Sequence, residues 1–89
     1  MYQMKTKYSA ETAVFTVTIY KDGRITPVYQ ASRNTEARAI NAALAGGGFE
    51  VNNSRYDTFT VYHFSKNGSK KRVEFDQPSM ELIKSSFPV

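Results

Sequence analysis

The chain has 89 residues, no cysteine, one histidine and a net charge of +4 at neutral pH. This length suits one small domain over residues 1–89, and the missing cysteines and scarce histidine exclude a disulfide framework, a thiol nucleophile and a tight transition-metal site, so we expect no metal and no cofactor. No apolar run is long enough to span a bilayer and the first residues lack the apolar segment of a secretory signal, so we expect a cytoplasmic protein without a membrane partner.

The first residues show little periodicity, and we expect either a frayed arm or a short edge strand over residues 1–10. Residues 12–20 are rich in β-branched and aromatic side chains that alternate, which predicts a strand. Its core face is expected to carry Phe15, Val17 and Ile19.

A hairpin turn is predicted at Asp22-Gly23, because a type I′ turn needs positive φ at both of its central residues. The returning strand is expected over residues 25–30. Pro27 has no amide donor, so this strand should lie at a sheet edge or carry a bulge.

An alanine-rich helix is predicted over residues 35–45, with Asn34 or Thr35 as its N-cap and glycines 46–48 as its stop. Its apolar stripe is expected to contain Ala37, Ile40 and Leu44.

The second half of the chain predicts a short strand over residues 49–53 and a hairpin of residues 57–65 and 70–76, joined at Asn67-Gly68. The first hairpin strand is heavy on both faces, with Phe59, Val61 and His63 on one and Tyr62 and Phe64 on the other. Such a strand is either covered on both sides or exposes a functional aromatic face.

A short helix is predicted over residues 78–87, with Met80, Ile83 and Phe87 on one apolar stripe. The predicted class is therefore α+β, with a mostly antiparallel sheet of four or five strands in the order β-β-α-β-β-β-α. The alanine-rich helix should pack on one face of this sheet, because two hairpins cannot bury a face alone.

Tracing the strand directions brings three loops to one end: residues 21–24, 46–48 and 65–71. This end would carry a rim of cations, namely Lys21, Arg24, Lys66, Lys70, Lys71 and Arg72. Tyr20 and Tyr62 should lie at or near the rim, where their rings can stack on unpaired bases. Clustered cations of this kind attract phosphates more strongly than the net charge suggests.

Each of these signals also has a structural interpretation. A basic turn protects an edge strand from aggregation, and a triple glycine ends a helix. His63 in a sheet is typically a packed or hydrogen-bonded residue, and no nucleophile motif accompanies it, so we expect no enzyme.

Two functions from different classes remain. The first is a non-catalytic nucleic-acid-binding protein, with RNA or single strands favoured over duplex, that uses the eight rim residues named above. The alternative is a small interaction or inhibitor protein of the phage-encoded type that occupies an acidic host protein. In that case the aromatic strand of residues 59–64 would supply an interface core or the seam of a homodimer.

Overall fold

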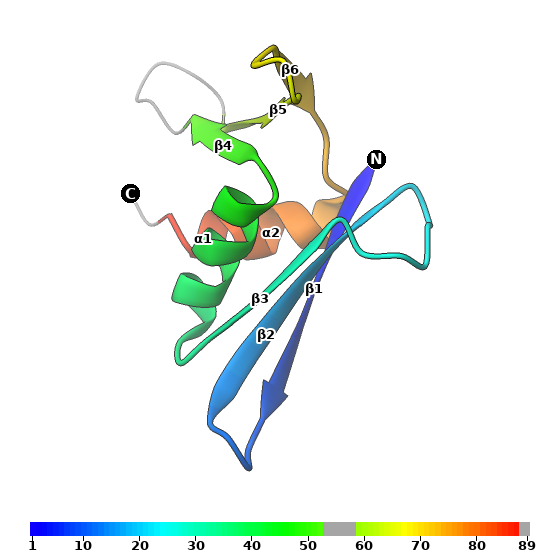
Figure 1. The fold of residues 1–89 in the computed structure, drawn as a ribbon. Coiled ribbons are helices and arrows are strands. Elements are labelled where there is room, and N and C mark those ends of the chain that lie inside the picture. Colours follow the sequence, from blue (N-terminus) through cyan, green and yellow to red (C-terminus); the bar gives the residue numbers. More distant parts are fainter. Residues whose placement is uncertain (53–58, 88–89) are drawn as a thin grey trace.

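The computed structural model describes residues 1–52 and 59–87. Its elements are β1 (Tyr2–Ser9), β2 (Val14–Lys21), β3 (Tyr29–Arg33), α1 (Glu36–Gly46), β4 (Phe49–Asn52), β5 (Thr60–Phe64), β6 (Lys70–Val73) and α2 (Gln77–Ser85). The α+β class is confirmed (Figure 1).

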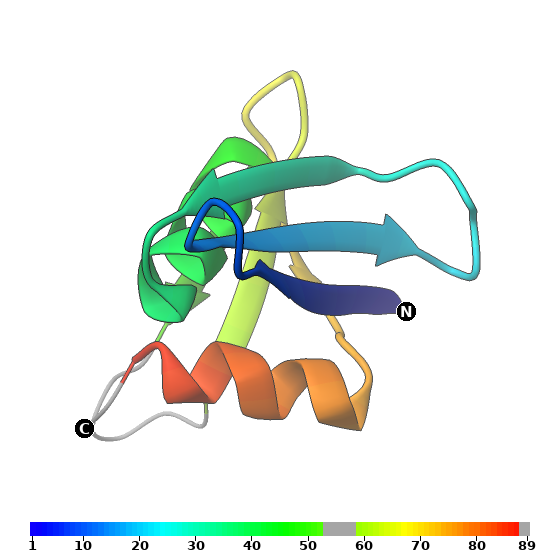
Figure 2. The ribbon, with the colours of Figure 1, turned by 90° about the horizontal axis from the view of Figure 1, so that it is seen from below.

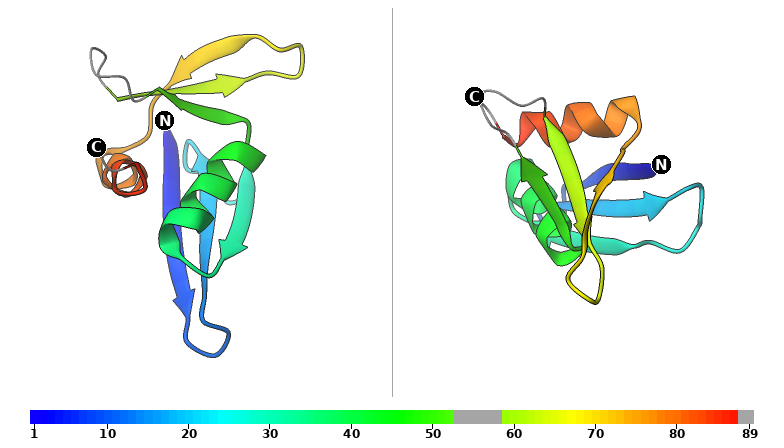
Figure 3. Two further views of the ribbon diagram at one scale, coloured as in Figure 1. Left: turned by 90° about the vertical axis from the view of Figure 1, so that its left-hand side faces the viewer. Right: turned by 90° about the horizontal axis from the view of Figure 1, so that it is seen from above.

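The described strands form two sheets, so the prediction of one sheet with four or five strands was wrong. One sheet has the order β1-β2-β3 and the other β4-β5-β6, and every pairing within them is antiparallel. The observed order is β-β-β-α-β-β-β-α, with one more strand before the helix than we expected. Figure 3 shows the second sheet lying across one end of the first, with α1 on one face of the first sheet.

The additional strand is β1. The sequence had predicted either a frayed arm or a short edge strand for this segment, and the structure shows the edge strand. It pairs with β2 over its whole length, from Tyr2 opposite Lys21 to Ser9 opposite Val14. Directly opposed residues share a face, so Met4 lies on the same buried side as Ile19.

The turn after β2 has the backbone predicted for Asp22-Gly23, with φ of 46° at Asp22 and 72° at Gly23. The Arg24 amide donates to the Lys21 carbonyl at 2.9 Å and closes the turn. The returning strand begins only at Tyr29, however, so the prediction of residues 25–30 was displaced. Residues 24–28, which include a proline without an amide donor, form a projecting loop instead (Figure 2).

Helix α1 begins after Thr35, whose hydroxyl accepts the Arg38 amide at 3.2 Å as predicted for an N-cap. The buried residues of the helix are Ala39, Ile40, Ala43 and Leu44. Ala37, which we placed on the apolar stripe, is exposed. The small side chains at positions 39 and 43 let the helix approach β2 and β3 closely, and this turns the buried face away from position 37.

Strand β5 buries Val61, so the face with Phe59, Val61 and His63 is the inward one, and α2 buries Ile83. The expected start of β5 at residue 57 lies outside the described residues. Helix α2 is capped by Asp76, whose carboxylate accepts the Ser79 amide at 3.0 Å.

Tyr2 joins the two sheets. Its amide donates to the Glu74 carbonyl at 2.8 Å, and its carbonyl accepts the Asp76 amide at 3.0 Å, which makes a parallel bridge to Phe75. Its ring meets Phe49 edge-to-face at 5.1 Å between centroids. The core is therefore continuous from the first sheet into the second.

Candidate nucleic-acid interface

The outer face of the second sheet carries an aromatic and cationic surface. The pairing register places Tyr62 opposite Arg72 and Phe64 opposite Lys70, so these four side chains share one face. We call them the β5–β6 face. The buried side chain of Val61 defines the opposite, inward face. No described element packs over the β5–β6 face (Figure 3, left).

The two aromatic rings of this face are open to solvent to different degrees. Phe64 is 39% exposed, and Tyr62 is half-buried. The Lys70 ammonium lies 4.6 Å from the centroid of the Tyr62 ring, within the range of a cation–π interaction. The face thus combines flat π surfaces with charges of the sign that attracts phosphate.

The turn that joins β5 to β6 is held by its own polar groups. The Ser65 amide donates to the Ser69 carbonyl at 2.9 Å, and the Asn67 side-chain oxygen accepts the Ser69 amide at 3.0 Å. Lys66 lies on this turn and is exposed. The hairpin therefore projects its cation beyond the edge of the β5–β6 face.

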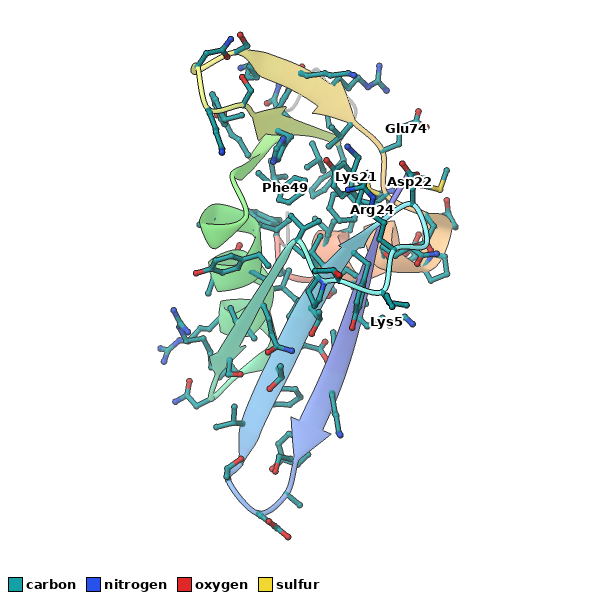
Figure 4. All side chains as sticks on the ribbon, turned by 45° about the vertical axis from the view of Figure 1, so that its right-hand side comes forward. Lys5, Lys21, Asp22, Arg24, Phe49 and Glu74 are labelled. Atoms are coloured by element: carbon teal, nitrogen blue, oxygen red, sulfur yellow. The ribbon has the colours of Figure 1, made fainter. Side chains whose placement is uncertain are left out.

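A second basic feature is an open cleft of about 580 Å³, which we call the inter-sheet cleft. It lies where the start of β1 and the turn after β2 meet β6. Its charged side chains are Lys21, Asp22, Lys71, Arg72 and Glu74. Figure 4 shows Lys21, Asp22 and Glu74 gathered at this junction. The cations outnumber the carboxylates, and the Asp22 carboxylate is paired with the amine of Met1.

Tyr2 and His63 supply the rings of the inter-sheet cleft. The Lys21 ammonium lies 5.9 Å from the centroid of the Tyr2 ring. Burial raises the pKa of the Tyr2 hydroxyl, and the nearby Asp22 charge adds to the effect. The hydrogen bond from the Met1 amine lowers the pKa of Asp22, as do the neighbouring Lys21 and Arg24. At neutral pH the Tyr2 phenol is therefore neutral and the Asp22 carboxylate is an anion.

His63 has the structural surroundings that its sequence context suggested. Its Nε2 lies 3.2 Å from the Gly47 carbonyl oxygen, and its ring centroid is 4.8 Å from that of Phe49. The first interaction holds the ring against the end of α1 and the second against β4.

The triple glycine serves the helix end. The Gly47 amide donates to Ala43 at 2.9 Å and the Gly48 amide to Ala45 at 3.2 Å, so both amides already have acceptors. Gly46 leaves room for the ring of Tyr29, because a Cβ there would lie 2.2 Å from the ring. These contacts agree with the interpretation that the glycines end the helix.

The predicted rim residues are divided among four places. The β5–β6 face holds Tyr62, Lys70 and Arg72, and the inter-sheet cleft holds Lys21 and Lys71 and is also lined by Arg72. Tyr20 and Arg24 line a separate pocket on the first sheet, and Lys66 lies on its turn. The two hairpin tips project in different directions, so the expected single rim is split (Figure 3, right).

Two residues belong to these surfaces although the sequence analysis did not assign them there. Phe64 was placed on the aromatic face but not among the binding residues. Lys5 lies with its ammonium 5.5 Å from the centroid of the Tyr20 ring. The alternation of Tyr2, Met4 and Thr6 with polar residues is the signal that would have identified a strand and placed Lys5 on its outer face.

Comparison of the chain with protein-family models, curated proteins and solved structures found no match. Residues 1–52 and 59–87 contain no cluster of His, Asp and Glu suited to a metal ion. Neither helix in the part of the chain that the structure describes is long and apolar enough to cross a membrane.

Proposed function

We propose that this protein is a non-catalytic nucleic-acid-binding protein that takes single-stranded RNA or DNA on its β5–β6 face. The observation that carries the proposal is the register of β5 and β6, which sets Tyr62 opposite Arg72 and Phe64 opposite Lys70 on an uncovered face. Aromatic rings stack on bases of any sequence, and neighbouring cations hold the phosphates.

Unpaired bases fit this face better than a duplex does. Stacking on Tyr62 or Phe64 needs a base whose π surface is free, and in a duplex those surfaces face other bases. The inter-sheet cleft adds Lys21 and Lys71 on the inner side of the same hairpin. These side chains give the backbone of a bound strand further cations beyond the edge of β6.

The test is fluorescence anisotropy with a 5′-fluorescein-labelled 12-nucleotide oligouridylate at several salt concentrations. The affinity should fall steeply with salt, because phosphate contacts release counterions. Tyr62→Ala should weaken binding about 5- to 100-fold through the loss of one base stack, and Tyr62→Phe should keep most of the affinity.

Tyr8→Ala is the matched control. Tyr8 is also a strand tyrosine, 53% exposed, but it lies at the far end of the β1–β2 ribbon. The proposal fails if the wild-type protein does not bind oligouridylate or the corresponding oligodeoxythymidylate at low salt. It also fails if Tyr8→Ala weakens binding as much as Tyr62→Ala.

A protein partner is the second candidate, and the exposed apolar side chains favour it. Ile25 is 93% exposed and Phe64 is 39% exposed, and both stand beside cations. An acidic host protein, or a second copy of this chain through the β5–β6 face, would then be the partner. Binding would depend less steeply on salt than nucleic-acid binding does, and Phe64→Ala would weaken it more than loss of the lysines. The elution volume of the purified protein separates a dimer from a monomer.

A further inference from the structure

A separate pocket lies on the face of the first sheet that points away from α1. It has a volume of about 260 Å³ and is lined by Gln3, Lys5, Tyr20, Gly23, Arg24 and Ile25. We call it the Tyr20 pocket.

The strand register explains how this pocket is built. Gln3 pairs with Tyr20 and Lys5 pairs with Thr18, so these side chains share the outer face of the sheet. The residues between them, such as Met4 and Ile19, point to the core. The loop after β2 adds Arg24 and Ile25 from the side, and Figure 4 shows Lys5 and Arg24 on the same side of the ribbon.

The chemistry of the lining is that of a nucleotide site. Tyr20 offers an aromatic ring, and Ile25 offers an aliphatic side chain that is 93% exposed. Lys5 and Arg24 contribute two cations, and the six lining residues include no carboxylate. A base between a ring and an aliphatic side chain buries apolar surface, while its phosphate meets the cations.

The Tyr20 pocket and the inter-sheet cleft are neighbours, because one turn contributes residues to both. Lys21 and Arg24 belong to the same turn, and Lys21 lines the inter-sheet cleft while Arg24 lines the Tyr20 pocket. Figure 4 shows both side chains between the end of β6 and Lys5. Cations therefore continue from the second sheet to the outer face of the first.

We infer that the Tyr20 pocket takes one nucleotide of a single strand that is also bound at the β5–β6 face. This inference rests on the proposed function and extends it: the strand follows the inter-sheet cleft, past Lys71 and Lys21, and ends in the pocket. A short oligonucleotide occupies the β5–β6 face alone, whereas a longer one reaches both places.

The experiment compares labelled oligouridylates of 4 and 12 nucleotides by anisotropy. Tyr62→Ala should weaken both. Tyr20→Ala should weaken only the 12-nucleotide strand, by about 5- to 100-fold, because one base stack is lost. Ile25→Ser should weaken the same strand, and its 93% exposure means that the fold does not depend on it. Lys5→Ala should also weaken only the 12-nucleotide strand, and Lys7→Ala is its control, because Lys7 lies on the same face of β1 but does not line the pocket.

The outcomes separate the two claims. If neither strand binds the wild-type protein, the proposed function and the Tyr20 pocket fail together. If both strands bind and depend on Tyr62, but Tyr20→Ala and Ile25→Ser leave the 12-nucleotide affinity within twofold of wild type, only the pocket is overturned. Equal losses for the two strands in Tyr20→Ala also overturn it, because length dependence is its signature.

Discussion

The two three-stranded sheets are both antiparallel, yet they differ in how they divide their side chains between core and solvent. In the first sheet, β1 and β2 have eight residues each, and β2 holds Val17 and Ile19 with no exposed surface. In the second sheet the strands have four or five residues, and β6 contributes no fully buried side chain. The first sheet and α1 therefore carry much of the core, while β6 directs three successive cations to solvent.

This difference leads us to expect that substitutions on β6 change the proposed binding while leaving stability nearly unchanged. A short, polar edge strand adds little burial, so its side chains are free to serve a ligand. The following predictions test this division, from the largest expected effect to the smallest.

Ile19→Ala should be the most damaging. The side chain is fully buried between the first sheet and α1, and its truncation leaves a cavity. We expect the free energy of unfolding to fall by about 2–5 kcal/mol. Urea unfolding followed by circular dichroism measures this loss. A loss below about 1 kcal/mol would mean that the first sheet is not the main source of stability.

The triple substitution Lys70→Ala, Lys71→Ala and Arg72→Ala should change binding and leave stability nearly intact. Each lost phosphate contact with a single strand lowers the slope of log affinity against log salt by about 0.7, so three contacts give roughly 2. Anisotropy titrations at four salt concentrations measure the slope. An unchanged slope would place the phosphate contacts elsewhere, and unfolding in this variant would contradict the division between the sheets.

Asp76→Ala tests the connection between the sheets and α2, because Asp76 is the N-cap of that helix. We expect a loss of about 1 kcal/mol in the free energy of unfolding at neutral pH. The hydrogen bond from Ser79 holds the pKa of Asp76 below its ordinary value. The cap therefore stabilises the fold above the ordinary pKa of an aspartate, and this stabilisation is lost as the pH falls through the lowered value.

The measurement is urea unfolding of both proteins at neutral pH and again at strongly acidic pH. The difference between wild type and Asp76→Ala should shrink on acidification, because both chains then lack an anionic cap. Glu11→Ala is the control, since Glu11 is exposed and caps no helix. A difference that stays constant with pH would show that the charge of Asp76 does not stabilise α2.

Phe64→Ala should have the smallest effect on stability, within about 0.5 kcal/mol, because the ring is on the surface. It should nevertheless weaken oligouridylate binding if the β5–β6 face holds bases. Thermal unfolding and anisotropy on the same preparation measure the two quantities. A large loss of stability would show that Phe64 packs as part of the core.

Local features of this fold could be predicted from the sequence because local chemistry determines them. The cap at Thr35, the positive φ values at Asp22 and Gly23, and the inward side chains of Val17 and Ile19 all follow from a few neighbouring residues. The helix stop at the glycines is of the same kind.

The two hairpin pairings, β2 with β3 and β5 with β6, were predicted, but the grouping of the strands into two sheets was not. Alternation shows which side of a strand is apolar, but it does not show which strand lies beside it. That is why one sheet was expected where two exist, and why the projecting loop that delays β3 was not foreseen.

The residues of the candidate site also fall into a part that local structure determines and a part that distant contacts determine. Tyr62 and Lys70 lie close together because one hairpin holds both, and a hairpin is a local structure. Tyr20 and Arg24 were expected beside them, but that expectation depended on how two hairpins are oriented, which distant contacts decide. Lys5 could be placed beside Tyr20 only once β1 was known to pair with β2.

The contact between β1 and α2 has a consequence for the order in which the protein assembles. The Met4 amide donates to the Ser79 hydroxyl at 2.7 Å across 75 positions of the chain. The hydroxyl is buried, so this bond cannot be replaced by water in the finished fold. During synthesis, the Met4 amide gains this partner only after the residues of α2 have been made and have packed against β1. Until that contact forms, the outer edge of β1 is open to pairing with another chain, as exposed edge strands are.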